Sequence, residues 1–98
     1  MVQIIWTKRA ITDLDSIAEY IAVDSEYAAQ KFIQELIKKT NSLLNYPEKG
    51  RPIPENIAGK YRQILHKRYR IIYKLEKKIV IIYSVYHQKK LLFKIEDD

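Results

Sequence analysis

All three prolines and both glycines of this chain fall within residues 46–60, "YPEKGRPIPENIAGK". Proline and glycine interrupt helices and strands, so this stretch predicts a loop. It separates a first half whose apolar residues recur at helical spacing from a second half that is rich in strand-like runs. This change of period predicts an α+β fold in which the helices precede most of the sheet.

The first half predicts two helices. One begins at Lys8, after Thr7 as a possible N-cap, and ends near Asp24; its apolar stripe is Ala10, Leu14, Ile17, Ala18 and Ile21. Ser25 can cap a second helix, whose apolar face continues until Pro47. Because only a short connection joins them, we expect an antiparallel helix hairpin.

Four runs predict strands: residues 2–7, 61–66, 69–75 and 79–87. The last run is apolar on both alternating faces, which favours a central strand. Short connections make the last three an antiparallel meander, and the N-terminal strand completes the same sheet. The helix pair must bury its apolar stripe on one face of the sheet, and we expect the opposite face to be left for function.

Composition fits a single domain over residues 1–98, since 98 residues with 47% apolar side chains allow one core. The chain has no cysteine and only His66 and His87 as imidazoles, so we expect no metal site and no cofactor. No run of about 18 apolar residues and no charged leader is visible. We therefore expect a cytoplasmic protein that does not enter membranes.

Positive charge is concentrated in the second half of the chain. Residues 60–90 carry ten lysines and arginines against the single acid Glu76, within a chain of net charge +6. Such asymmetry favours an anionic partner, whereas a solvated basic surface that keeps the protein soluble is the simpler alternative.

Several segments together resemble one protein family. They are "IIWTKRAITDLDSIAEYIA", "AAQKFIQELI", "LLNYPEKGRPIPE", "YRIIY" and "VYH". Their order and spacing are similar to those of the RelE/ParE toxins of bacterial type II toxin–antitoxin modules, over about residues 4–87. The resemblance implies a RelE/ParE-like fold and a small basic toxin that a co-expressed antitoxin neutralises.

The family includes two mechanisms. RelE-like members cut mRNA on the ribosome without a metal ion, whereas ParE-like members poison DNA gyrase. The resemblance thus implies either an mRNA endoribonuclease, which we rank first, or a gyrase poison. A subgroup of nuclease members has a tyrosine after the terminal histidine and a glutamate in the loop, where this chain has Gln88 and Ile53. A non-catalytic basic binding module or an inactive toxin is the third alternative.

The nuclease interpretation assigns roles by resemblance. Arg70 and Arg62 would hold the phosphate, and His87 would act as the acid or base. The basic residues expected to bind RNA are Lys60, Lys67, Arg68, Lys89 and Lys90.

Each of these residues also has a structural alternative. Arg70 can form an ion pair with Glu55 or with the chain terminus, because arginine suits carboxylates as well as phosphates. His87 can end its strand with a hydrogen bond. The strand tyrosines are expected to be packing residues rather than RNA-stacking residues.

Strand register distinguishes these possibilities. A two-residue turn at Lys77 and Lys78 would pair Arg70 with Val85 and place Arg68, Arg70 and His87 on one face. A three-residue turn starting at Glu76 would put His87 on the other side of the sheet from Arg70. The nuclease interpretation requires the first register, or a bulge with the same effect.

Overall fold

The structure, a computed structural model, describes residues 2–55 and 59–89. Its elements are β1 (Gln3–Trp6), α1 (Lys8–Ala22), α2 (Glu26–Asn41), the 3-10 helix η1 (Ser42–Leu44), β2 (Arg51–Pro52), β3 (Tyr61–His66), β4 (Tyr69–Glu76) and β5 (Ile79–His87). The strands form one sheet in the order β1-β5-β4-β3-β2. The α+β prediction and its strand order along the chain are confirmed.

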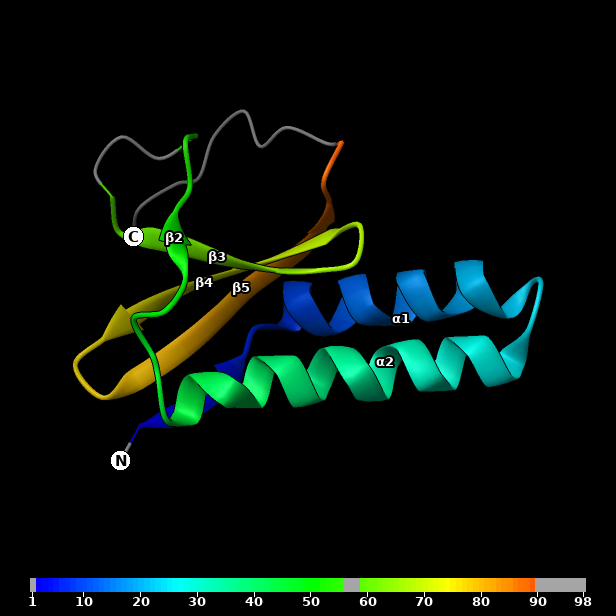
Figure 1. Cartoon of the computed structure of the whole chain (residues 1–98), viewed down its shortest axis with the longest axis horizontal. Coiled ribbons are helices and arrows are strands. Elements are labelled where there is room, and N and C mark those ends of the chain that lie inside the picture. The colour runs from blue at the N-terminus through cyan, green and yellow to red at the C-terminus, as the bar shows by residue number, and fades with distance from the viewer. Residues whose placement is uncertain (1, 56–58, 90–98) are drawn as a thin grey trace.

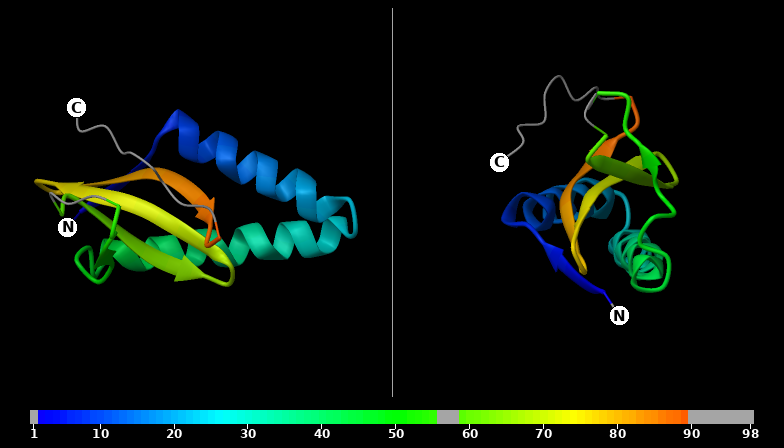
Figure 2. Two further views of the ribbon diagram at one scale, coloured as in Figure 1. Left: turned by 90° about the horizontal axis from the view of Figure 1, so that it is seen from above. Right: turned by 90° about the vertical axis from the view of Figure 1, so that its left-hand side faces the viewer.

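Both predicted helix caps are present. The Oγ1 of Thr7 accepts a hydrogen bond from the backbone N–H of Ala10 (3.1 Å), and the Oγ of Ser25 accepts one from Ala28 (3.0 Å). Each cap satisfies an N–H group that the first turn of a helix leaves without an intrahelical partner. Figures 1 and 2 show the resulting antiparallel hairpin, whose far end extends beyond the strands.

The face of the sheet that the hairpin covers, here called the helix face, carries the main core. Leu36 of α2 is fully buried, as are Ile71 of β4 and Ile82 of β5. They belong to one cluster with Phe32 and Leu43. Burial of each such side chain contributes about 1.5–3 kcal/mol, so this face supplies most of the apolar stabilisation.

The opposite face of the sheet, here called the loop face, is also covered, but its buried cluster is smaller. Ile53 (2% exposed), Tyr61 (3%) and Ile72 (0%) form a second buried cluster there. The covering segment contains β2, a two-residue strand that pairs with β3 inside the stretch predicted to be a loop. Figure 1 shows β2 next to the first residues of β3, with which it pairs. The central part of the face that was expected to be left for function is therefore buried.

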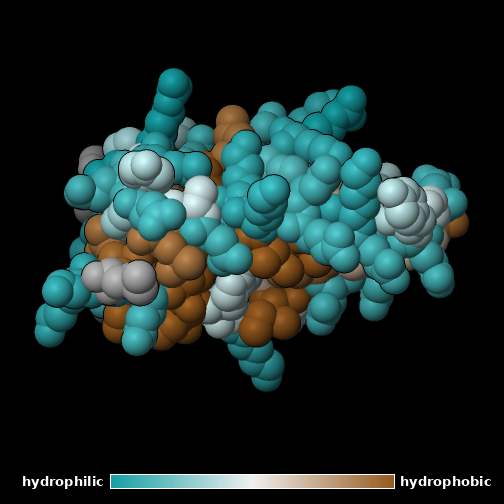
Figure 3. All heavy atoms as spheres, turned by 60° about the horizontal axis from the view of Figure 1, so that its bottom comes forward, coloured by the Kyte–Doolittle hydropathy of each residue, from teal (hydrophilic) through white to brown (hydrophobic). Residues whose placement is uncertain are grey.

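Among the described strands, β1 forms one edge of the sheet and pairs with β5, in parallel. Figure 3 shows a group of apolar side chains on one side of the molecule. Two large apolar residues at this end of the fold are exposed, Ile5 of β1 (48%) and Leu44 of η1 (38%). The helices within the described residues are too short and too polar to span a bilayer.

Candidate functional site

A groove lies between α1 and the adjoining ends of β4 and β5, with a volume of about 590 Å³. Its polar lining residues are Asp13, Ser16, Tyr20, Arg68, Tyr69, Tyr86 and His87. The groove thus combines a cation, an imidazole and phenol groups, which are the side chains that acid–base chemistry on a phosphate would use. It contains His87 and Arg68 from the sequence-based set.

His87 is fixed at the end of β5. Its ring meets the Tyr69 ring edge to face at a centroid distance of 5.2 Å, and its Nδ1 accepts a hydrogen bond from the backbone N–H of Lys89 (3.1 Å). The backbone N–H of Gln88 donates to the carbonyl of Arg68 (2.7 Å). The predicted hydrogen bond of a strand-ending histidine is confirmed. With Nδ1 accepting, Nε2 is the ring nitrogen left to face a ligand.

Asp13 positions the helix beside this groove, and the sequence analysis did not identify it. Its Oδ2 accepts hydrogen bonds from the Ser84 hydroxyl and from the backbone N–H of Val85 (3.0 Å). Ser84 is fully buried in the middle of β5. A serine within an apolar strand and an acid near the start of an amphipathic helix were the available signals. The carboxylate ties α1 to β5 and sets one wall of the groove.

Arg70 lies elsewhere, on the loop face. Its guanidinium donates to both carboxylate oxygens of Glu55 (2.7 and 2.8 Å), and its Nε donates to the Gln63 side chain (2.7 Å). The Arg70 and Glu55 side chains are only 7% and 11% exposed. The ion pair with Glu55 is therefore confirmed, and it occupies the planar fork with which Arg70 would hold a phosphate.

A β-bulge determines which residues share a face. Glu76 pairs with Ile79 across a two-residue turn, as the first register predicts, but the register shifts between Ile72 and Tyr73. Beyond the shift, Arg70 pairs with Tyr86 and Tyr69 pairs with His87. Since side chains of paired residues lie on the same face, Arg70 and His87 lie on opposite faces. The predicted pairing of Arg70 with Val85 is wrong because the bulge adds a residue to β5.

Arg62 supports the loop that leads into β2. Its Nη1 donates to the backbone carbonyls of Gly50 (2.8 Å) and Glu48 (3.2 Å). Tyr73 supports the same loop, because its hydroxyl donates to the Pro47 carbonyl (2.8 Å) and accepts from the Gly50 N–H (2.9 Å). Burial, the largest cause, raises the pKa of the Tyr73 hydroxyl above its ordinary value. The three residues predicted to be catalytic are thus in three separate surroundings.

The residues predicted to bind RNA are also divided. Lys67 and Arg68 form the two-residue turn between β3 and β4, and Lys89 follows β5 nearby. Lys60 precedes β3 and so lies at the other end of that strand. Lys90 and the apolar tail after it lie outside the described residues.

The strand tyrosines are packing residues, as predicted. Tyr61 and Tyr73 are buried, and Tyr83 packs against Tyr61 at a centroid distance of 5.4 Å. Arg9 of α1 lies over the rings of Tyr83 (5.3 Å) and Tyr86 (5.6 Å) and donates hydrogen bonds to both hydroxyls. This cation–π arrangement ties the start of α1 to the loop face.

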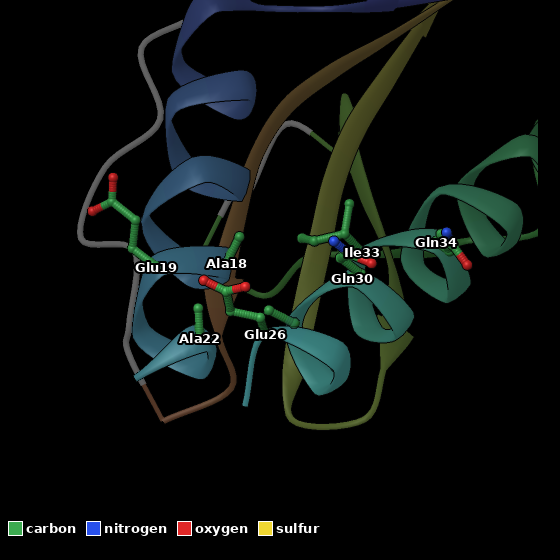
Figure 4. Close-up of a pocket in the computed structure, with 8 residues that line it drawn as sticks. Ala18, Glu19, Ala22, Glu26, Gln30, Ile33 and Gln34 are labelled. Atoms are coloured by element: carbon green, nitrogen blue, oxygen red, sulfur yellow. The ribbon is translucent and has the colours of Figure 1, made fainter. Parts of the chain in front are cut away.

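The distal half of the hairpin has a second hollow, of about 590 Å³, between the two helices. Ala18 and Ala22 of α1 and Ala29 and Ile33 of α2 form its apolar lining, and Figure 4 shows Glu26 and Gln30 at its rim. Within residues 2–55 and 59–89 no group of His, Cys, Asp or Glu could hold a metal ion.

Comparisons with known proteins agree with this architecture. Residues 4–92 match the family described as "ParE toxin of type II toxin-antitoxin system, parDE". A segment of 51 residues is 45% identical to Toxin RelE2 of Caulobacter vibrioides, and the match covers 52% of this chain and 58% of that protein. The chain thus matches a little over half the length of that relative.

Two solved structures share the fold. The chromosomal ParDE toxin–antitoxin system from P. aeruginosa matches with a TM-score of 0.70 and 21% identity, over 89% of this chain and 95% of that one. The toxin–antitoxin complex RelBE2 from Mycobacterium tuberculosis matches with a TM-score of 0.59 and 20% identity, over 88% and 96% of the two chains.

Proposed function

Because the chain belongs to the ParE toxin family of type II toxin–antitoxin systems, we propose that it is the growth-arresting toxin of such a module and that its target is DNA gyrase. A co-expressed antitoxin neutralises it. The basic chain, of net charge +6, suits an antitoxin segment with acidic character.

The observation that carries the choice of gyrase is the separation of the candidate nuclease residues. Metal-free RNA cleavage requires a phosphate clamp and an acid or base within reach of the same phosphate. Arg70 lies on the loop face in a buried ion pair with Glu55, whereas His87 lies on the opposite face. Arg62 holds loop carbonyls. A poison that acts by binding does not need these groups to converge.

The hairpin offers a binding surface for such a poison. Tyr20 (76% exposed), Val23 (84%) and Tyr27 (74%) surround the connection between α1 and α2, in the part of the hairpin that extends beyond the sheet in Figure 1. Exposed apolar and aromatic residues beside an apolar hollow are typical of protein interfaces. These three residues are here called the hairpin tip, and they are the proposed gyrase contact.

Supercoiling by purified gyrase tests this function. The protein is expected to inhibit supercoiling, and the double variant Val23→Asp/Tyr27→Asp is expected to inhibit at least tenfold less, because it places charge in the apolar interface. Ile11→Asp is the matched control, since Ile11 is an exposed residue (49%) of α1 outside the tip. Circular dichroism checks that all variants are folded. An unaltered protein that leaves supercoiling intact, or a tip variant that inhibits as strongly as its parent, contradicts the proposal.

Ribosome-dependent mRNA cleavage is the second candidate, since Arg68 and His87 line one groove with Tyr20. In that case cuts in ribosome-bound mRNA should disappear in His87→Ala, and gyrase should be unaffected. A protein that only binds its partner would arrest growth by neither route.

A further inference from the structure

A hollow of about 470 Å³ lies where the C-terminal end of α2 meets the turn between β3 and β4. Four lysines from three separate segments line it: Lys38, Lys39, Lys49 and Lys67. Glu35 is the one acid among the described residues of the lining, and its Oε1 is 3.3 Å from the Nζ of Lys67. Four lysines against one glutamate leave this lining with an excess of positive charge.

His66 forms part of the lining of this hollow. The residue is only 8% exposed, and its ring packs against Phe32 at a centroid distance of 5.1 Å. Its Nε2 is buried and has no hydrogen-bond partner among the described residues. Buried polar groups in native proteins are nearly always hydrogen-bonded, so this nitrogen lacks a partner that a molecule bound in the adjoining hollow would supply.

The basic lining has a partial explanation in helix electrostatics. Lys38 and Lys39 lie in the last turn of α2, where cations stabilise the helix dipole. That explanation does not extend to Lys49 and Lys67, which come from other segments. A neighbouring hollow along β3 shares Lys39 and Lys49 and adds Arg51, so the positive surface continues past the helix end.

The electrostatic potential within the hollow is positive at the His66 imidazole. Burial, followed by the charges of Lys39 and Lys67, lowers the pKa of His66 below its ordinary value, while Glu35 acts in the opposite direction. An oxyanion in the hollow would offset these charges and accept a hydrogen bond from Nε2. The oxyanion would thus meet both the excess of positive charge and the unpaired Nε2, while the Glu35 Oε1, which is also buried without a hydrogen bond, keeps Lys67 as its ionic partner.

We propose that this hollow is a phosphate-binding site, in which His66 donates a hydrogen bond from Nε2 and the lysines neutralise the phosphate charge. The phosphate belongs either to a nucleic-acid backbone or to a free phosphate ester. Lysine and histidine donors around one anion provide the positioning contacts that phosphate groups use in nucleic-acid complexes. None of the lining residues belongs to the hairpin tip or to the His87 groove. The site therefore stands or fails independently of the gyrase proposal.

The two histidines allow a direct test by NMR. His66 and His87 are the only imidazoles in the chain, so each gives its own ring signals, and His87 serves as an internal control. Inorganic phosphate is titrated in one arm, and a short single-stranded DNA or RNA oligonucleotide in the other. We expect saturable shifts of the His66 signals with little change at His87. We also expect the His66 pKa to rise in the bound state, because the added negative charge favours the imidazolium.

Charge variants identify the binding residues. Lys39→Gln/Lys67→Gln is expected to weaken binding at least tenfold, whereas Lys77→Gln/Lys78→Gln removes the same charge from the distant turn between β4 and β5 and should have little effect. His66→Phe keeps an aromatic ring against Phe32 and removes Nε2. We expect it to remain folded and to bind the oligonucleotide or phosphate about tenfold more weakly.

Each outcome has a defined meaning. Shifts at His66 with the oligonucleotide assign the site to a nucleic-acid backbone, and shifts with inorganic phosphate alone assign it to a free phosphate ester. Unchanged His66 signals in both arms overturn the proposal, as do equal shifts at His66 and His87. Equal losses of binding in the two lysine double variants also overturn it, because they indicate attraction to net charge only.

Discussion

The two faces of the sheet are closed in different ways. On the helix face, side chains of two amphipathic helices pack into a continuous apolar core around Leu36, Ile71 and Ile82. On the loop face, a short segment is held by the ion pair between Arg70 and Glu55 over a small cluster that contains Ile53 and Ile72. The first closure is distributed over many apolar contacts, whereas the second depends on few polar ones.

Arg70, which resembles a functional residue in the sequence, makes a structural contact on the loop face. A buried arginine is tolerated only with a partner of opposite charge, and Glu55 supplies that partner across the covering segment. The role of the arginine is then to attach the loop to the sheet.

The largest expected effect is on the loop face. Arg70→Ala should lower the free energy of unfolding by about 3–5 kcal/mol, because the Glu55 carboxylate remains largely buried without the guanidinium. Arg70→Met/Glu55→Leu is the matched variant and should recover most of that loss, since apolar side chains replace both charges. Urea denaturation measures both. A single variant as stable as its parent would mean that the ion pair does not hold this face.

On the helix face, Leu36→Ala should cost about 3 kcal/mol, because it removes buried methyl groups and leaves a cavity. Ile37→Ala, at the next position of the same helix, should cost less than about 1 kcal/mol because Ile37 is 38% exposed. The same denaturation experiment compares them. Similar losses at the two positions would contradict the assignment of the core to one stripe of α2.

The position of the loop before β2 depends on hydrogen bonds of the Tyr73 hydroxyl. Tyr73→Phe should cost about 1–2 kcal/mol, because the Gly50 N–H and the Pro47 carbonyl both lose their hydrogen bond to the hydroxyl. Hydrogen exchange at Gly50 should accelerate in this variant. Tyr46→Phe, at an exposed tyrosine (67%) near the same loop, is the control and should change neither quantity.

The smallest expected effect is a pH dependence from His66, at the edge of the helix face. Its pKa in the folded protein lies below the ordinary value of 6.5, so the unfolded chain takes up the proton more readily. The contribution of neutral His66 to the free energy of unfolding is therefore complete above about pH 6.5 and is lost as the pH falls below that value. Urea midpoints at pH 7.5 and 5.5 should differ less in His66→Phe than in the parent. An equal pH dependence in the two proteins would contradict this role.

The sequence was sufficient for most of what depends on local periodicity, although α2 ends at Asn41 and not near Pro47. Thr7 and Ser25 cap the helices as predicted, and the strand residues 61–66 and 79–87 match β3 and β5 at both ends. Alternation and capping are encoded within a few neighbouring residues, so they can be read without the fold.

The site was less predictable because it depends on contacts between distant segments. The bulge in β5 places the side chains of Arg70 and His87 on opposite faces of the sheet, whereas regular pairing would place them on the same face. Alternation alone does not indicate where a strand gains a residue. Asp13 and Ser84 are 71 residues apart, and neither has a local pattern that reveals the other. The pair of Arg70 and Glu55 was named as an alternative, but only the fold of the covering segment brings the two together.

The most direct test of the central claim, that the protein acts by binding gyrase and not through the His87 imidazole, is gyrase inhibition by purified His87→Ala beside the unaltered protein. We expect the two proteins to inhibit supercoiling equally, because the substitution leaves the tip residues Val23 and Tyr27 unchanged and neither of them lines the His87 groove. Failure of the unaltered protein to inhibit gyrase, together with cuts in ribosome-bound mRNA that His87→Ala abolishes, would contradict the claim and establish the nuclease.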